Sequence, residues 1–274
     1  MCFFNKQIMV KWLRDNNLLW LAEKLRFYLD ILKNWGTNRT FKNQMKNFVF
    51  PPWEIAYDAY SSINHPYYYT SGFQAAKVIY NMLCPYLLQD TSRICEWGCG
   101  PARIIRHMPQ IASAQKFVFM GTDYNKTTIS WCQENIKNVE FFVNGLTPPL
   151  SFPNNYLDCV YCISVFTHLS KEMHFAWLKE IMRVLKPGGV FMMSMNGDNI
   201  KKTQLKEERE LYESGQLVVR GNAKEGSRTF LAFHSPIFMR ETFLNGYDIL
   251  KHDTNPDRYI SSGQDIWIVR KPSV

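Results

Sequence analysis

The stretch from Arg93 to Arg103, which reads RICEWGCGPAR, constrains the fold of this chain more than any other. A short run ends in an acidic residue, Glu96, and is followed by Gly98, Gly100 and a proline that suits the first turn of a helix. A strand that turns through glycines into a helix is how an α/β sheet presents backbone N–H groups to a ligand. The stretch therefore predicts a ligand-binding turn in an α/β sheet.

The rest of the chain alternates between short, mostly apolar strands and helices. The expected strands are 93–97, 116–122, 139–143, 157–163, 189–195, 247–252 and 264–270. The expected helices are 72–88, 102–109, 127–136, 171–185 and 237–244. Apolar strands that alternate with helices indicate a mostly parallel sheet covered on both faces.

The composition of the 274 residues is that of a globular protein, because 46% of them are hydrophobic. A mostly disordered chain is excluded on this ground. No apolar run approaches the roughly 18–20 residues of a membrane-spanning helix, and the first residues do not read as a signal peptide. The seven cysteines are an odd number, and several lie in apolar stretches, which favours reduced thiols in a cytoplasmic protein.

The net charge of +8 belongs mainly to the N-terminal segment. Residues 1–50 hold nine Lys or Arg and three acidic residues, whereas the remainder is nearly balanced. A basic segment can bind nucleic acid, an anionic membrane or an acidic partner. The simpler interpretation is a lysine-rich helix face in water.

Five leucines in this segment recur at steps of three and four, which predicts an amphipathic helix over residues 12–33. They are Leu18, Leu21, Leu25, Leu29 and Leu32, with basic residues between them. We expect this apolar face to pack on the domain or on a second copy of the chain, which would make a homo-oligomer. A helix that lies on a membrane surface is the alternative.

Two further regions are expected to border a substrate. Residues 57–69 are dense in tyrosine, although these rings could equally belong to the core. Residues 198–228 are charged and contain glycines, which predicts a long insertion or a lid.

The spacing around the glycine turn distinguishes between ligands. Arg103 stands where a dinucleotide-binding turn has its third glycine, and Glu96 would repel a pyrophosphate. S-adenosylmethionine suits the turn better, because it carries positive groups and no phosphate. Asp123 follows the next strand, where an acidic residue meets a ribose diol or caps the following helix. Asn144 and Gly145 could meet an adenine or form an ordinary turn.

Together these features resemble the class I S-adenosylmethionine-dependent methyltransferases of the small-molecule type. The resemblance is carried by Glu-x-Gly-x-Gly, then Asp123, VFTHL and RVLKPGG, over residues 93–195. It implies a Rossmann-like α/β fold with a seven-stranded, mostly parallel sheet and helices on both faces. The methyltransferase domain would cover residues 51–274, after a basic helical extension over residues 1–50.

The resemblance also implies a set of cofactor-binding residues. The glycine turn would hold the methionine part, the acidic residue after the second strand would bind the ribose, and the third strand would end at the adenine. The residues after the fourth strand would line the wall near the sulfonium, and the segment just ahead of the first core helix would fold over the cofactor. The implied residues are Tyr69, Ser71, Glu96, Gly98, Cys99, Gly100, Arg103, Asp123, Tyr124, Asn144, Gly145, Ile163, Ser164 and Val165.

Methyl transfer is an in-line displacement at carbon, so positioning and exclusion of water can supply most of the acceleration. A base is needed only when the acceptor must lose a proton. His168, which follows the fourth strand, is the candidate base, and His234 is a second candidate. A structural role in capping or packing the next helix is the alternative for His168.

The expected acceptor is a small molecule that is methylated on oxygen or nitrogen. The loop after the fourth strand lacks the Asp/Asn-Pro-Pro-aromatic pattern of nucleic-acid amino-methylating enzymes, so nucleic acid is disfavoured. An RNA or protein methyltransferase that uses the basic segment, and a non-catalytic cofactor-binding scaffold, remain alternatives. Cys159 and Cys162 have CxxC spacing, but they lie in an apolar strand without a second pair, so no metal site is expected.

Overall fold

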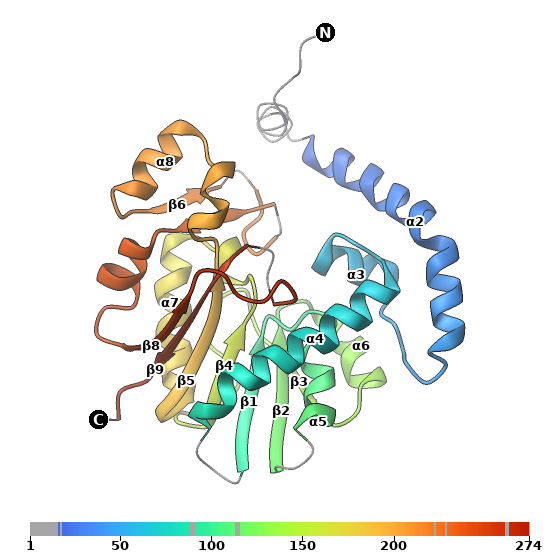
Figure 1. The fold of residues 1–274 in the computed structure, drawn as a ribbon, viewed down its shortest axis with the longest axis horizontal. Helices are drawn as coiled ribbons and strands as arrows, with labels where there is room; N and C mark the ends of the chain where they lie inside the picture. The colour runs from blue at the N-terminus through green and yellow to red at the C-terminus, as the bar shows by residue number, and fades with distance from the viewer. Residues whose placement is uncertain are drawn as a thin grey trace.

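The centre of the computed structural model is a seven-stranded sheet in the order β3-β2-β1-β4-β5-β9-β8 (Figure 1). The structure describes residues 16, 18–87, 91–112, 116–221, 223–227, 229–260 and 263–273. The strands are β1 (Thr91–Trp97), β2 (Lys116–Asp123), β3 (Glu140–Val143), β4 (Leu157–Cys162), β5 (Leu185–Met195), β8 (Asp248–Asp253) and β9 (Asp265–Arg270). Strands β1 to β5 are parallel, and β9 runs antiparallel to both of its neighbours. The predicted Rossmann-like fold is confirmed.

The central strands are apolar on both sides because each face of the sheet carries its own buried layer. In β4, Cys159 and Tyr161 belong to one layer, whereas Val160 and Cys162 belong to the other. This alternation follows from the two-residue period of a strand. It also places the two cysteines of the CxxC sequence on opposite faces of the sheet, where they cannot share a metal ion.

Helices cover both faces of the sheet (Figure 1). One layer contains α4 (His65–Leu83), α5 (Met108–Ile111) and α6 (Lys126–Asn135). The other contains α7 (Lys171–Val184) and a π-helical segment, η5 (Phe238–Phe243). The Ser170 hydroxyl caps α7 by accepting the Met173 N–H at 3.4 Å.

Two helices near the glycine turn differ from their predicted bounds. The helix expected at 102–109 is replaced by a turn, the short 3₁₀ helix η2 (Ile105–His107) and α5. Ala102 has a φ of +57°, and a left-handed residue cannot take part in a right-handed helix. Helix α4 begins earlier than expected because the Asn64 side chain accepts the Tyr67 N–H at 2.7 Å.

The segment predicted as an insertion or lid has its own secondary structure. It contains η4 (Asp198–Thr203), α8 (Lys206–Glu213) and a hairpin of β6 (Leu217–Arg220) and β7 (Leu231–His234). Figure 1 shows these elements beyond the carboxyl ends of β4 and β5. The loop of the hairpin thus starts and ends near the edge at which ligands bind in α/β sheets.

Helix α2 (Leu19–Gln44) runs along the outside of the molecule, beyond α3 (Trp53–Tyr60) and α4 (Figure 1). It extends past the expected end at residue 33, and residues 12–15 of the prediction lie outside the described residues. It contacts the domain through aromatic rings, with Phe27 5.1 Å from Tyr57 between ring centres, and through hydrogen bonds. Asn38 donates to the Ile63 carbonyl at 2.8 Å and accepts from the His65 N–H at 2.8 Å. No helix in the described part of the chain is long and apolar enough to cross a membrane.

The expectation that the leucines of α2 pack on the domain is wrong. Leu21, Leu25, Leu29 and Leu32 are 54%, 61%, 56% and 75% exposed, respectively. The side of the helix that faces the domain carries the buried Asn34 and Asn38 together with Phe27 and Phe41, and these leucines point away from it.

Candidate active site

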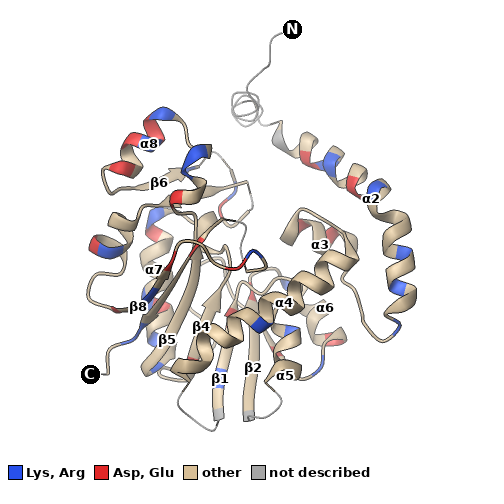
Figure 2. Ribbon diagram, in the orientation of Figure 1, with Lys and Arg blue, Asp and Glu red and all other residues tan. Residues whose placement is uncertain are grey.

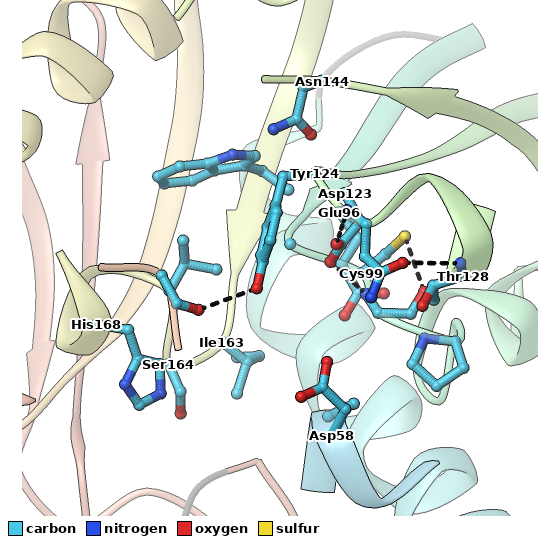
Figure 3. Close-up of a pocket in the computed structure, with 18 of the residues that line it drawn as sticks. Asp58, Glu96, Cys99, Asp123, Tyr124, Thr128, Asn144, Ile163, Ser164 and His168 are labelled. Atoms are coloured by element: carbon cyan, nitrogen blue, oxygen red, sulfur yellow. Dashed lines mark hydrogen bonds between the residues drawn. The ribbon is translucent and has the colours of Figure 1, made fainter. Parts of the chain in front are cut away.

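A cavity of about 240 Å³ lies over the glycine turn, at the carboxyl ends of β1, β2 and β4 (Figure 3). Most of the residues predicted from the sequence lie on its wall. They are Glu96, Gly98, Cys99, Gly100, Arg103, Asp123, Tyr124, Asn144, Gly145, Ile163, Ser164 and Val165, with the candidate base His168. Residues from four separate segments of the chain meet here because the carboxyl ends of parallel strands share one edge of the sheet.

The glycine turn is held by hydrogen bonds and has no room for a side chain at Gly98. Gly98 has a φ of +73°, and a Cβ atom built on it would lie 2.3 Å from a Val165 methyl group. The N–H groups of Gly98 and Cys99 both donate to the Thr122 carbonyl, at 2.8 and 3.0 Å. These bonds fix the turn against β2, and the absence of a side chain lets a ligand approach the main chain.

The carboxyl group of Glu96 is buried at the end of β1, with 3% of the residue exposed. Its Oε2 accepts hydrogen bonds from the Ile105 N–H at 3.0 Å and the Tyr161 hydroxyl at 3.1 Å. Burial raises its pKa to about 8, and the Tyr161 hydrogen bond and the charge of Arg103 oppose that rise only in part. A positive group of a ligand would favour the ionised form of this carboxyl group.

Asp123 presents a second buried carboxyl group at the end of β2. Its Oδ2 accepts the Gly100 N–H and its Oδ1 accepts the Asn125 N–H, both at 2.9 Å. Burial raises the pKa of Asp123, and these N–H groups act against that rise. The alternative role as a helix cap is wrong, since the Asn125 side chain caps α6 by accepting the Thr128 N–H.

Two polar donors at the glycine turn lack a hydrogen-bond partner among the described residues. They are the Tyr60 hydroxyl and the Arg103 Nε. Arg103 also donates from Nη1 to the Ser71 hydroxyl at 3.0 Å, and its guanidinium lies 5.2 Å from the centre of the Tyr60 ring. Buried donors of this kind are the groups that a ligand carboxylate satisfies.

Tyr69 and Ser71 do not line the cavity. The Tyr69 ring packs outside it, against Phe48 at 4.9 Å and His107 at 5.4 Å between ring centres. The neighbouring Tyr68 points to the glycine turn instead, and its hydroxyl donates to the Pro101 carbonyl at 2.6 Å. One position along a helix rotates a side chain by about 100°, so the early start of α4 decides which tyrosine faces the turn. Ser71 contributes indirectly, through its bond to Arg103.

At the far end of the cavity, the side-chain amide of Asn144 forms hydrogen bonds with neighbouring residues of the protein. Its Oδ1 accepts from the Thr122 hydroxyl at 2.6 Å, and its Nδ2 donates to the Gly145 carbonyl at 2.6 Å. The Tyr124 ring lies on the wall beside it, and the Tyr124 hydroxyl donates to the Gly226 carbonyl at 3.3 Å (Figure 3). The lid thus reaches across the cavity to the end of β2.

Ser164 holds a strained position where β4 ends. Its φ is +62°, which is uncommon for a residue with a side chain. Its N–H donates to the Ser194 hydroxyl at 2.7 Å, and its own hydroxyl donates to Gln264 Oε1 at 2.8 Å. These bonds to β5 and to the segment before β9 stabilise the turn that brings Val165 against Gly98.

His168 lies on the cavity wall with a defined tautomer. Its Nδ1 is 2.7 Å from the Phe230 carbonyl, which can only accept a hydrogen bond, so the proton is on Nδ1 and Nε2 is an acceptor. Burial lowers the pKa of His168, and the bond to Phe230 opposes that change. The His168 carbonyl also accepts the Gly226 N–H at 2.9 Å, which fastens the lid to this wall.

Residues 95–193, which hold the glycine turn, Asp123 and His168, match the family described as "Methyltransferase domain". This stretch is therefore a methyltransferase domain, of the kind found in the class I S-adenosylmethionine-dependent methyltransferases. It is 28% identical over 182 residues to a sterol 24-C-methyltransferase of Gibberella zeae, covering 62% of this chain and 43% of that protein. It is 30% identical over 105 residues to a fatty-acid O-methyltransferase of Mycolicibacterium smegmatis, covering 38% of this chain and 36% of that protein. The chain therefore spans less than half the length of these relatives.

Solved methyltransferases share the fold. The magnesium protoporphyrin IX methyltransferase from Synechocystis, with bound S-adenosylhomocysteine, superposes with a TM-score of 0.51 at 14% identity and covers 88% of this chain and 98% of its own. A methyltransferase from Methanosarcina mazei superposes with a TM-score of 0.50 at 21% identity, over 69% of this chain and 97% of its own.

The donor set of the cavity fits the methyltransferase cofactor, S-adenosylmethionine. Its amino group needs a carboxylate acceptor, and Glu96 is one. Its carboxylate needs buried donors, and Tyr60 and Arg103 carry donors without partners among the described residues. Its ribose needs an acceptor for two hydroxyl groups, and Asp123 lies at the end of β2 where class I folds bind a ribose.

His234, the second candidate base, does not reach the cavity of this methyltransferase. It is 1% exposed, and its Nε2 lies 2.7 Å from the Nε2 of His174, which is fully buried in α7. His174 donates from Nδ1 to the Ser170 carbonyl, so its Nε2 accepts from His234. Burial lowers the pKa of His174 to about 4 and that of His234 well below its usual value, so both rings are neutral.

Several residues on the cavity wall were not predicted from the sequence. Asp58 of α3 faces the cavity (Figure 3), and its only signal was its place in the tyrosine-rich segment 57–69. Leu146, Leu169 and Trp177 also line the cavity. These apolar residues could not be told from core residues, because Trp177 belongs to the buried face of an amphipathic helix.

Proposed function

We propose that this methyltransferase transfers the methyl group of S-adenosylmethionine to an oxygen or nitrogen atom of a small molecule with an apolar part. The observation that carries the proposal is one cavity in which the glycine turn, the buried carboxyl groups of Glu96 and Asp123, and the imidazole of His168 meet under the lid. The cofactor would occupy the glycine-turn side, and the acceptor would occupy the His168 side.

The size and covering of the cavity support a small acceptor. The lid residue Gly226 is bonded to Tyr124 on one wall and to His168 on the other, so the lid crosses the acceptor side. A folded RNA or protein would have to displace these contacts. The apolar wall of Leu146, Val165 and Trp177 favours an acceptor with an apolar part, and two relatives carry names that refer to a sterol and a fatty acid.

The residues of the chain would position the reactants and receive a proton. S-adenosylmethionine, when bound, supplies an activated methyl group on its sulfonium. Ile163 and Val165 would exclude water from the reacting carbon. As the acceptor atom bonds to the methyl group it releases its proton, and Nε2 of His168 offers a lone pair that can take it, since Nδ1 donates to the Phe230 carbonyl.

The first test concerns the cofactor. Calorimetry of the purified chain should detect binding of S-adenosylmethionine and S-adenosylhomocysteine. The Asp123→Asn variant should bind about 10–100-fold more weakly, because hydrogen bonds to a charged group contribute about 1.5–3 kcal/mol. The matched control is Asp248→Asn, which removes an exposed carboxylate on β8 and should leave the affinity unchanged. Equal affinities of the two variants would show that Asp123 does not bind the cofactor.

The second test concerns the acceptor and the base. The chain is incubated with methyl-labelled cofactor and, separately, with lipid, small-metabolite, RNA and protein fractions. Label in a small molecule is expected. Label confined to RNA or protein contradicts the proposal, and no label despite cofactor binding indicates a scaffold.

His168→Gln should lower kcat about 10²–10⁴-fold without changing cofactor affinity. Because burial lowers the pKa of His168, activity should be full at pH 7 and decline below pH 6.5 as Nε2 is protonated.

A further inference from the structure

Helix α2 carries an apolar stripe on the side that faces away from the domain. We define the outer stripe as Leu21, Leu25, Tyr28, Leu29 and Leu32. Each of these side chains is exposed, from 53% for Tyr28 to 75% for Leu32. Their spacing of three, four and one residues puts them on one side of a helix with 3.6 residues per turn. Contiguous exposed apolar surface of this kind marks a binding site.

Hydrogen bonds on the opposite side of α2 prevent the helix from turning this stripe inward. Asp30 Oδ2 accepts the Ile63 N–H at 2.7 Å, and Asn34 Oδ1 accepts from the Asn64 amide at 2.7 Å. Asn38 adds two bonds of 2.8 Å to the same loop, one to Ile63 and one to His65. Rotation of the helix would leave these buried groups without partners, which is unfavourable. The outer stripe is therefore a stable feature of the surface.

The charged residues that border the outer stripe of α2 are basic. The helix carries five basic residues, Lys24, Arg26, Lys33, Arg39 and Lys42, and all are exposed (Figure 2). Its two acidic residues lie on the inner side, where Asp30 binds the domain and Glu23 pairs with Arg26 at 2.7 Å. At about 100° per residue, Lys24 and Lys42 border one edge of the stripe, and Arg26 and Lys33 border the other.

We propose that the outer stripe binds the surface of an anionic lipid bilayer, with α2 lying parallel to the membrane. An apolar helix face between two rows of basic residues is the arrangement that buries leucines among acyl chains while Lys and Arg reach the headgroups. Tyr28 is of a residue type that favours this interface. A second copy of the chain fits less well, because a symmetric contact through the stripe would bring the two basic borders together. The proposal concerns the location of the protein and does not depend on the methyl acceptor.

The test is flotation of the full chain with lipid vesicles. Vesicles of phosphatidylcholine with about a third phosphatidylserine should carry the protein, and vesicles of phosphatidylcholine alone should carry much less. Replacing Lys24 and Lys33 by Gln should weaken binding to the anionic vesicles about fivefold per residue and leave the weak neutral binding unchanged.

A triple variant, Leu25→Ser, Leu29→Ser and Leu32→Ser, should lose at least about a hundredfold in binding to the anionic vesicles, because three apolar side chains no longer leave water. The matched control is Leu211→Ser with Val219→Ser, which removes exposed apolar residues from α8 and β6 and should bind as the wild type does. Far-ultraviolet circular dichroism checks that both variants are folded.

Two outcomes would overturn the proposal. One is a wild-type chain that floats with neither vesicle type, or that floats equally well after the triple substitution. The other is a lipid-free dimer in sedimentation that the triple variant converts to a monomer and that anionic vesicles do not dissociate. That result would assign the outer stripe to a second copy of the chain.

Discussion

Helices α7 and α2 each carry a stripe of apolar side chains, yet they use these stripes in opposite ways. In α7, Trp177, Leu178 and Ile181 are 1%, 4% and 0% exposed and pack on the sheet. In α2, the leucines of the outer stripe are more than half exposed, while Asn34 and Asn38 are 5% and 3% exposed. An apolar stripe on a helix therefore predicts that this face favours leaving water. It does not predict which surface the face contacts, because that depends on the rest of the structure.

The largest difference is expected when a leucine of each helix is shortened. Leu178→Ala should lower the free energy of unfolding by about 2–5 kcal/mol, because it opens a cavity in the core. Leu32→Ala removes the same atoms from a side chain that is 75% exposed and should change it by less than about 0.5 kcal/mol. Urea denaturation measures both. Similar losses for the two variants would mean that the outer stripe is packed in solution.

The second difference concerns pH, because α7 carries the buried His174. Its pKa is about 4 in the folded protein and about 6.5 when unfolded, so the unfolded chain binds more protons between these values. His174 alone should therefore leave the free energy of unfolding unchanged above pH 6.5 and lower it by about 3 kcal/mol as the pH drops to 4, and other buried histidines such as His234 add to that fall. His174→Gln should make that fall shallower. An identical pH dependence of the variant and the wild type would exclude His174 as its source.

The smallest expected effect on stability concerns the polar side of α2. Asn38→Ala should lower the free energy of unfolding by about 1–3 kcal/mol, because it leaves the Ile63 carbonyl and the His65 N–H without their partner. Asn43→Ala, on the exposed side of the same helix, is the control and should have little effect. If Asn38→Ala were as neutral as its control, the polar side would not be what holds α2 to the domain.

Much of the sheet and of the cofactor side could be predicted because the signals are local. Apolar strands alternating with helices predicted the parallel sheet. Helix boundaries were missed where Ala102 takes a left-handed conformation, where the Asn64 cap starts α4 early, and where α2 continues to Gln44. The glycine turn, Glu96 and Asp123 were predicted at the cavity because strand ends in a parallel sheet share one edge. Tyr60 and Arg103 add donors on the cofactor side of the cavity. Their contacts depend on where α3 and α4 lie, which no local sequence pattern indicates.

The acceptor side was harder to predict. His168 followed from its position after β4, whereas His234 looked equally polar in the sequence and proved to be paired with His174 in the core. Tyr69 was expected over the cofactor, but the Asn64 cap starts α4 early enough that Tyr68 takes the inward position. Each of these outcomes depends on the rotation of an element or on a partner distant in the chain.

The sequence by itself determined the fold class, the cofactor and the existence of an amphipathic N-terminal helix, because strand periodicity, glycine conformation and leucine spacing act over a few residues. Only the tertiary structure decided which face of that helix meets the domain. Asp30, Asn34 and Asn38 found matching groups in the loop before α4, and buried polar groups must be satisfied. The leucines were left facing outward, which turned an expected packing surface into a candidate membrane-binding surface.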